Sequence, residues 1–168
     1  MKSPSIRSIF TFLLAPAFLL AFTSKPDKAN FSGNWKLNES KSDLGRMANF
    51  ATRTMKAEQK DDAITISRTA PSFNGDDFTT TETLTFDGKE ADSKLFGNST
   101  KKATAKWSDD GQTLTITYTL FLDFNGNTNE IKGTESWVLS DGGKTLTVQN
   151  NSSSSFGDLA TKSVFEKQ

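Results

Sequence analysis

The sequence predicts an all-β protein, folded as an antiparallel up-and-down β-barrel of eight to ten strands. Three observations support this prediction. Apolar and polar residues alternate over several short segments, turn-forming residues separate these segments, and a Gly-x-Trp pattern at Gly33 and Trp35 opens the first of them. Alternation with a period of two is typical of a strand with one buried face, and strands joined by tight turns form meanders that close on themselves.

Turn-forming residues bound most of the predicted strands. In chain order the strands span residues 34–38, 53–60, 63–70, 78–86, 101–107, 113–122, 130–139, 144–150 and 161–166, and a short piece near 90–92 could add another. The turn signals are Asp61-Asp62, Asp87-Gly88, Asp109-Asp110-Gly111, Asn125-Gly126 and Asp141-Gly142-Gly143. Alternation is clearest in residues 63–68, 113–118 and 145–148, where threonine and other β-branched residues suit a half-buried antiparallel strand.

The segment 39–52 separates the first two predicted strands and has a different pattern. A short helix capped by Ser42 or Asp43 would place Leu44, Met47 and Phe50 on one face. A loop packed on the barrel is the simpler interpretation. The alternative is a lid over an open end of the barrel.

The first 23 residues have the order of a cleavable secretory signal. Lys2 and Arg7 supply the positive start, an almost wholly apolar run spans residues 9–22, and Ala21 and Thr23 place small residues at the −3 and −1 positions of a cut after residue 23. A membrane anchor is the competing interpretation, but a span needs about 20 apolar residues and this run is shorter. We therefore expect export to a periplasmic or extracellular location, with no stable membrane span after cleavage.

Residues 24–168 would then form one domain, since their number suits a single core. The full sequence has 20 basic and 20 acidic residues, and removal of Lys2 and Arg7 leaves 18 basic residues, so the net charge changes from 0 to −2. Such a surface offers no electrostatic attraction for nucleic acid. A protein partner is not indicated.

Two residue types are missing from the sequence, histidine and cysteine. Without them there is no disulfide, no His-ligated haem, no usual zinc site and no Ser-His or Cys-His nucleophile pair. We therefore predict no cofactor, no metal and no catalytic residues. Any enzyme chemistry would have to use carboxylates, Lys, Tyr or Ser.

The segment 31–42, which contains Gly33 and Trp35, resembles the start of lipocalins and fatty-acid-binding proteins, the calycin superfamily, and of small exported lipocalin-like proteins of bacteria. The resemblance extends over nearly all of residues 24–168. It implies a barrel that binds a small molecule. It also implies that Gly33 and Trp35 form a structural plug at one end, with the Trp beneath a basic residue near the last strand, either Lys162 or Lys167.

Strand alternation assigns side chains to the inside of the barrel. The predicted interior is mostly apolar and aromatic, with a few charged or polar groups among the apolar ones. The candidate ligand-binding residues are Arg53, Met55, Phe78, Glu82, Leu84, Lys101, Ile116, Tyr118, Glu135 and Trp137.

The same interior allows two interpretations. The charged residues could pair with one another or sit at the rims of a filled barrel, which would then act as an envelope or extracellular interaction module. Alternatively, a cavity could hold a small apolar or amphipathic molecule, with its polar or carboxylate head near Arg53, Lys101 or Tyr118, because a buried charge needs a partner. We favour ligand binding as the function, and sequence alone does not separate the two.

Two further motifs carry less weight. Oxygen-bearing residues alternate over 123–130 as in a calcium loop, but a hairpin turn at Asn125-Gly126 explains this segment better. Glu82 and Glu135 could form a carboxylate pair for acid–base catalysis, which is a second and weaker alternative to ligand binding.

Overall fold

The computed structural model describes residues 27–72, 75–124 and 126–168. The predicted export signal and its cleavage site lie outside these residues. Within them, no helix is long and apolar enough to cross a membrane.

Ten antiparallel strands form one sheet, as the alternation predicted. They are β1 (Gly33–Leu37), β2 (Thr54–Gln59), β3 (Ala63–Pro71), β4 (Asp77–Thr85), β5 (Ala91–Lys94), β6 (Thr100–Trp107), β7 (Thr113–Phe124), β8 (Asn127–Ser140), β9 (Thr145–Ser154) and β10 (Leu159–Lys167). The short piece expected near residue 91 is β5. The largest departures are β8 and β9. β8 begins earlier than predicted because its first residues pair with the end of β7, and β9 ends later because its last residues still pair with β8.

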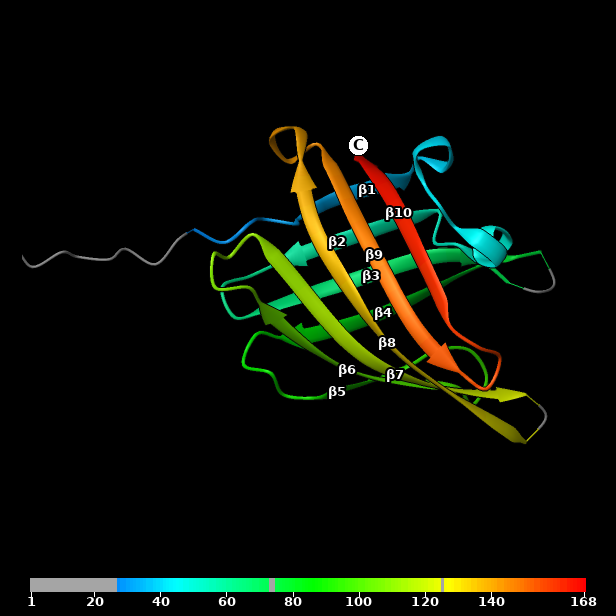
Figure 1. The fold of residues 1–168 in the computed structure, drawn as a ribbon. Coiled ribbons are helices and arrows are strands. Elements are labelled where there is room, and N and C mark those ends of the chain that lie inside the picture. Colours follow the sequence, from blue (N-terminus) through cyan, green and yellow to red (C-terminus); the bar gives the residue numbers. More distant parts are fainter. Residues whose placement is uncertain (1–26, 73–74, 125) are drawn as a thin grey trace, which may run out of the picture.

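The sheet is an up-and-down meander that nearly closes. Its strand order is β4-β3-β2-β1-β10-β9-β8-β7-β6-β5, so strands that follow one another in sequence pair, except β4 and β5, and β1 pairs with β10. β7 to β10 cross in front of β1 to β4 in Figure 1, and the two halves of the sheet face each other. β4 and β5 lie side by side at the two ends of the sheet without a hydrogen-bonded ladder in the described residues. This arrangement is the up-and-down barrel that the sequence predicts.

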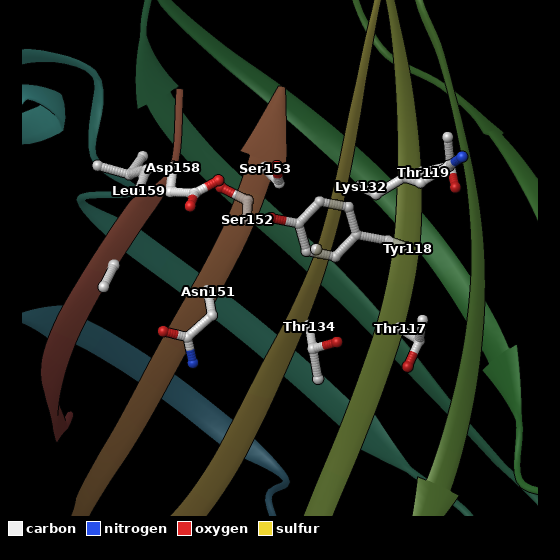
Figure 2. A pocket seen from close by; sticks show the side chains of 12 residues that line it. Thr117, Tyr118, Thr119, Lys132, Thr134, Asn151, Ser152, Ser153, Asp158 and Leu159 are labelled. Carbon is white, nitrogen blue, oxygen red and sulfur yellow. The ribbon is translucent and has the colours of Figure 1, made fainter. Parts of the chain in front are cut away.

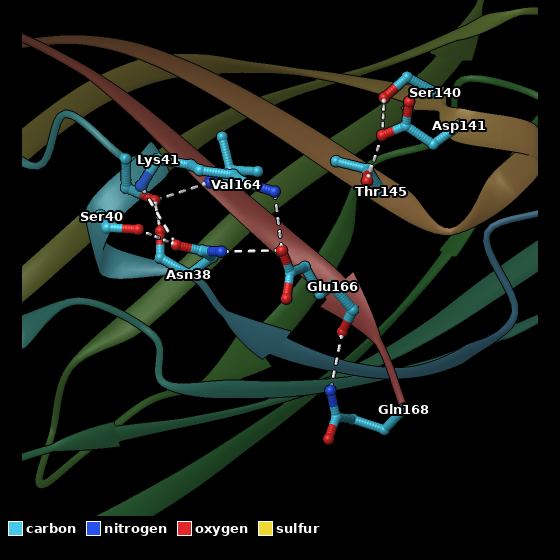
Figure 3. A network of polar contacts seen from close by, with 10 residues as sticks. Asn38, Ser40, Lys41, Ser140, Asp141, Thr145, Val164, Glu166 and Gln168 are labelled. Carbon is cyan, nitrogen blue, oxygen red and sulfur yellow. Dashed lines mark hydrogen bonds and ion pairs between the residues drawn. The ribbon is translucent and has the colours of Figure 1, made fainter.

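Two short 3₁₀ helices, η1 (Glu39–Lys41) and η2 (Gly45–Phe50), connect β1 to β2. Side chains anchor the first one to β10: Asn38 donates to Glu166 at 2.8 Å, and Lys41 pairs with the same carboxylate at 3.0 Å (Figure 3). The spacing of three between Leu44, Met47 and Phe50 suits a 3₁₀ helix, in which residues i and i+3 share a face.

One end of the barrel is filled by aromatic and aliphatic side chains. Trp35 is almost fully buried, and its indole Nε1 donates to the carbonyl of Phe31 at 3.0 Å. The Phe31 ring in turn stacks on Trp107 and meets Trp137 edge-on, with both centroid distances at 5.6 Å. The segment before β1 therefore closes this end of the barrel, where the resemblance implies the Trp35 plug.

Lys167 is the basic residue over this plug. Its Nζ lies 5.3 Å from the centre of the Trp35 ring. Gly33 has a φ of +150°, and a Cβ at this position would lie 2.6 Å from Cε of Lys167. The Gly-x-Trp pattern thus has a physical reason: the glycine leaves room for the lysine side chain that covers the tryptophan.

Candidate functional site

The opposite half of the barrel is hollow. Two adjoining chambers of about 750 Å³ and about 620 Å³ share part of their lining, and each is within the usual size of a small-molecule site. The residues common to both are Met47, Phe50, Thr52, Arg68, Tyr118, Leu120, Leu122 and Glu135. Met47 and Phe50 on η2 therefore line both chambers.

The mouth of the chambers is rimmed by exposed apolar side chains. The described residues include five exposed large apolar side chains, and four of them, Met47, Phe50, Phe96 and Phe156, line one or both chambers. Phe78 packs edge-on against Phe96 at 5.9 Å between ring centres. An apolar molecule at this mouth would meet an apolar surface before it reached the interior.

A layer of charged side chains separates the hollow half from the filled half. Arg68 on β3 reaches across the interior to Glu135 on β8, and its Nη1 and Nη2 donate to the two carboxylate oxygens at 2.7 Å each. Trp137 Nε1 donates to the same carboxylate at 2.9 Å. The guanidinium also lies over the Trp137 ring, 5.5 Å from its centre. This bidentate geometry is the strongest form of a side-chain ion pair.

A second ion pair in this layer spans the gap between the ends of the sheet. Lys101 on β6 donates to Oε1 of Glu82 on β4 at 2.7 Å, and both side chains are more than nine-tenths buried. Arg68 Nη2 lies 3.7 Å from the same Glu82 oxygen, which links the two pairs. β4 is one end of the sheet and β6 lies next to the other end, β5, so this side-chain contact links the two ends of the sheet.

The charges in this layer are strongly coupled. Burial alone would raise the pKa of Glu135, but the charge and hydrogen bonds of Arg68 outweigh burial and lower its pKa to about 2. Burial works against the charged form of Arg68 as well, yet Glu135 and Glu82 raise the pKa of Arg68 above its usual value. Both groups are therefore ionised at neutral pH, and their pairing offsets the cost of burying them.

We expect the Arg68–Glu135 pair to make folding sensitive to acid. Because the pKa of Glu135 falls from 4.5 to about 2 on folding, its contribution is complete above about pH 4.5 and is lost as the pH drops towards 2. Glu135→Gln should therefore be less stable than the wild type at pH 6, and the gap should shrink between pH 4.5 and 2.5. Urea unfolding of both proteins across this range measures the gap. A gap that stays constant would contradict the assignment.

Tyr118 lies beside the charged layer, and the position of its ring requires a glycine at residue 133. Its hydroxyl donates to Oδ1 of Asn150 on β9 at 2.6 Å, and its ring crosses β8 to get there (Figure 2). A Cβ on Gly133 would overlap this ring, so glycine is needed at the crossing. Burial, and next the nearby charge of Glu135, raise the pKa of Tyr118 to about 12, so the phenol stays protonated. The hollow drawn in Figure 2 surrounds this crossing and is lined mainly by polar side chains, unlike the two chambers.

Seven of the ten predicted cavity residues line a chamber. These are Met55, Phe78, Glu82, Lys101, Tyr118, Glu135 and Trp137. Leu84 and Ile116 point inward as expected, but they belong to the core cluster of the filled half and line neither chamber. The inward assignment of Arg53 is wrong. The backbone of Arg53 still bonds to Leu37 and Thr69, but Arg53 lies just before the start of β2, and its side chain is exposed and lines neither chamber.

Arg68 is the charged residue that the sequence argument missed. It shares its alternation with Ile64 and Ile66, both fully buried, so strand parity alone would have placed it inside. The pairing of charged residues, which the filled-barrel interpretation expected, and the cavity, which the binding interpretation expected, both occur in the structure. No group of three or more acidic side chains in the described ranges could hold a metal ion.

Comparison with known proteins identifies no family for this chain. No protein-family model matches the sequence, and no curated protein matches it. Among solved structures, the chain is similar to zebrafish ileal bile acid-binding protein complexed with cholic acid. The two are 16% identical, the match covers 82% of this chain and 98% of that chain, and the TM-score is 0.49. The assignment of the barrel rests on the strand pairing described above.

Proposed function

We propose that this protein binds a small apolar or amphipathic molecule non-covalently in the hollow half of its barrel, after export from the cytoplasm. The observation that carries the proposal is the pair of chambers, which join an apolar mouth to a polar floor. A ligand site of this kind typically has mostly apolar walls and a few polar groups that orient the molecule.

The carboxylate-enzyme alternative is less well supported. Glu82 and Glu135 do line the same chamber. A general acid at neutral pH needs a raised pKa, whereas the pKa of Glu135 is lowered by Arg68. Both carboxylates are also held in ion pairs, so neither is placed as a base waiting for a substrate proton.

Native mass spectrometry of the protein purified gently from its own cells tests the proposal. We expect an additional mass that disappears after solvent extraction, and a chain mass that begins at Ser24. The extra mass would identify the ligand class. A bare chain that also fails to take up added apolar molecules would contradict ligand binding and favour the interaction module.

A matched pair of variants tests where the ligand binds. Leu120 lines both chambers, so Leu120→Trp should fill the space and weaken binding of the uncharged dye Nile red at least tenfold. Val138 is exposed on β8 and lines neither chamber, so Val138→Trp should leave the affinity unchanged. Equal affinities for both variants, measured by fluorescence titration, would place the dye outside the barrel.

A further inference from the structure

The charged layer at the floor of the chambers is electrically balanced. Two cations, Arg68 and Lys101, face two anions, Glu82 and Glu135, and each cation has an anion oxygen at 2.7 Å. The layer therefore carries no surplus positive charge for an anionic ligand head. The charge balance limits the chemical class of the ligand. The inference that follows from it rests on the proposed function.

The layer does retain unused hydrogen-bonding capacity. Oε2 of Glu82 is buried and accepts no hydrogen bond from the described residues, and Nε of Arg68 is buried and donates none. Lys101 Nζ has three N–H groups, and its one hydrogen bond in the described part of the chain is to Glu82. Glu82, Arg68 and Lys101 all line the larger chamber. Lys101 thus has spare donors, and Oε2 of Glu82 and Nε of Arg68 become available to a head group once these side chains shift.

A hydroxyl group matches this combination, because it donates one hydrogen bond and accepts up to two. A carboxylate only accepts, so it would leave Oε2 of Glu82 unsatisfied. It would also give the layer a net negative charge in surroundings where burial of an uncompensated charge is costly. Arg46 lies at the mouth of the smaller chamber, but it is exposed, and water and salt weaken its attraction for an anion.

We propose that the ligand is an uncharged amphipath with a terminal hydroxyl, such as a long-chain alcohol, an isoprenoid alcohol or a sterol, and that the hydroxyl lies against the charged layer, beside Glu82, Arg68 and Lys101. The apolar body lies against Phe78, Leu120 and Leu122 in the larger chamber. Carboxylates of the same chain length bind more weakly.

Displacement of Nile red by dodecan-1-ol and by dodecanoate at pH 7.5 tests this directly, because the two molecules differ only in the head group. We expect dodecan-1-ol to bind at least tenfold more tightly. An equal or tighter affinity for dodecanoate overturns this inference and leaves the proposed function standing. If neither molecule displaces the dye and no other amphipath does, the proposed function fails and this inference fails with it.

Two variants shift the charge balance in opposite directions. Glu82→Gln leaves a surplus positive charge, so it should improve dodecanoate binding at least tenfold relative to dodecan-1-ol. Lys101→Met leaves a surplus negative charge and should widen the preference for the alcohol. Glu58→Gln makes the same chemical change on the exposed face of β2 and should change neither affinity.

Thermal unfolding by circular dichroism checks that each variant is folded. If Glu82→Gln does not fold, the Lys101→Met variant still decides the question. A head-group preference that stays the same in every folded charged-layer variant would overturn the placement of the hydroxyl at this floor.

Discussion

Replacing Trp35 with alanine is expected to lower the free energy of unfolding by about 3–5 kcal/mol, the usual cost of removing a large buried aromatic side chain. The ring is only 1% exposed, and Lys167 covers it. The loss removes packing contacts and also the hydrogen bond from Nε1 to the carbonyl of Phe31, which holds the closing segment in place. Chemical denaturation of the two proteins at neutral pH measures the difference.

Trp35→Phe provides the matched control. It keeps most of the aromatic packing but loses the hydrogen bond and part of the volume, so the cost should be smaller, on the order of 1–2 kcal/mol. A loss below about 1 kcal/mol for Trp35→Ala would show that Trp35 is not the plug of this barrel.

The second large effect concerns the ion pair across the barrel. Glu135→Leu should cost about 3–5 kcal/mol, because Arg68 would keep a buried charge without its bidentate partner and Trp137 Nε1 would lose its acceptor. Arg68→Met should be similarly costly, since Glu135 would then be buried as an unpaired anion. The double variant Arg68→Met/Glu135→Leu should recover most of the stability, because it removes both charges and replaces them with apolar side chains.

A double-mutant cycle measured by chemical denaturation gives the coupling between the two residues. The exposed pair Lys132–Glu130, with an Nζ to Oε1 distance of 2.6 Å, provides the control. Its coupling should be below about 1 kcal/mol, because water screens exposed ion pairs. A coupling for Arg68 and Glu135 no larger than that of the control would mean that the buried pair contributes little to folding.

The predicted strands agree with the structure because the signals that define them are local. In β3, Ile64 and Ile66 alternate with threonine and serine, and each sends its side chain to the same face whatever the rest of the chain does. The ends of strands are less local. Arg53 continues the alternation of Met55 and Ala57, and its backbone still bonds to Leu37 and Thr69, but it lies just before the start of β2, where its side chain is exposed.

The candidate site was predictable in its residue types but not in its shape. Glu82, Lys101 and Glu135 were expected inside because they share a strand face with apolar residues, and all three are buried. Their partners could not be deduced, because Arg68 and Glu135 are 67 residues apart and meet only across the closed barrel.

The sequence by itself determined the strands, the turns and the barrel class, because each depends on alternation or on neighbouring residues, whereas the role of Trp35 as a plug was implied only by the resemblance. Only the tertiary structure decided that one half of the barrel is filled and the other is hollow. That outcome depends on which side chains meet at the same level: Phe31, Trp107 and Trp137 fill one end, whereas Arg68 and Glu135 bridge the middle and leave space beyond them. Such contacts between side chains follow from barrel closure, which brings strands that are distant in sequence face to face.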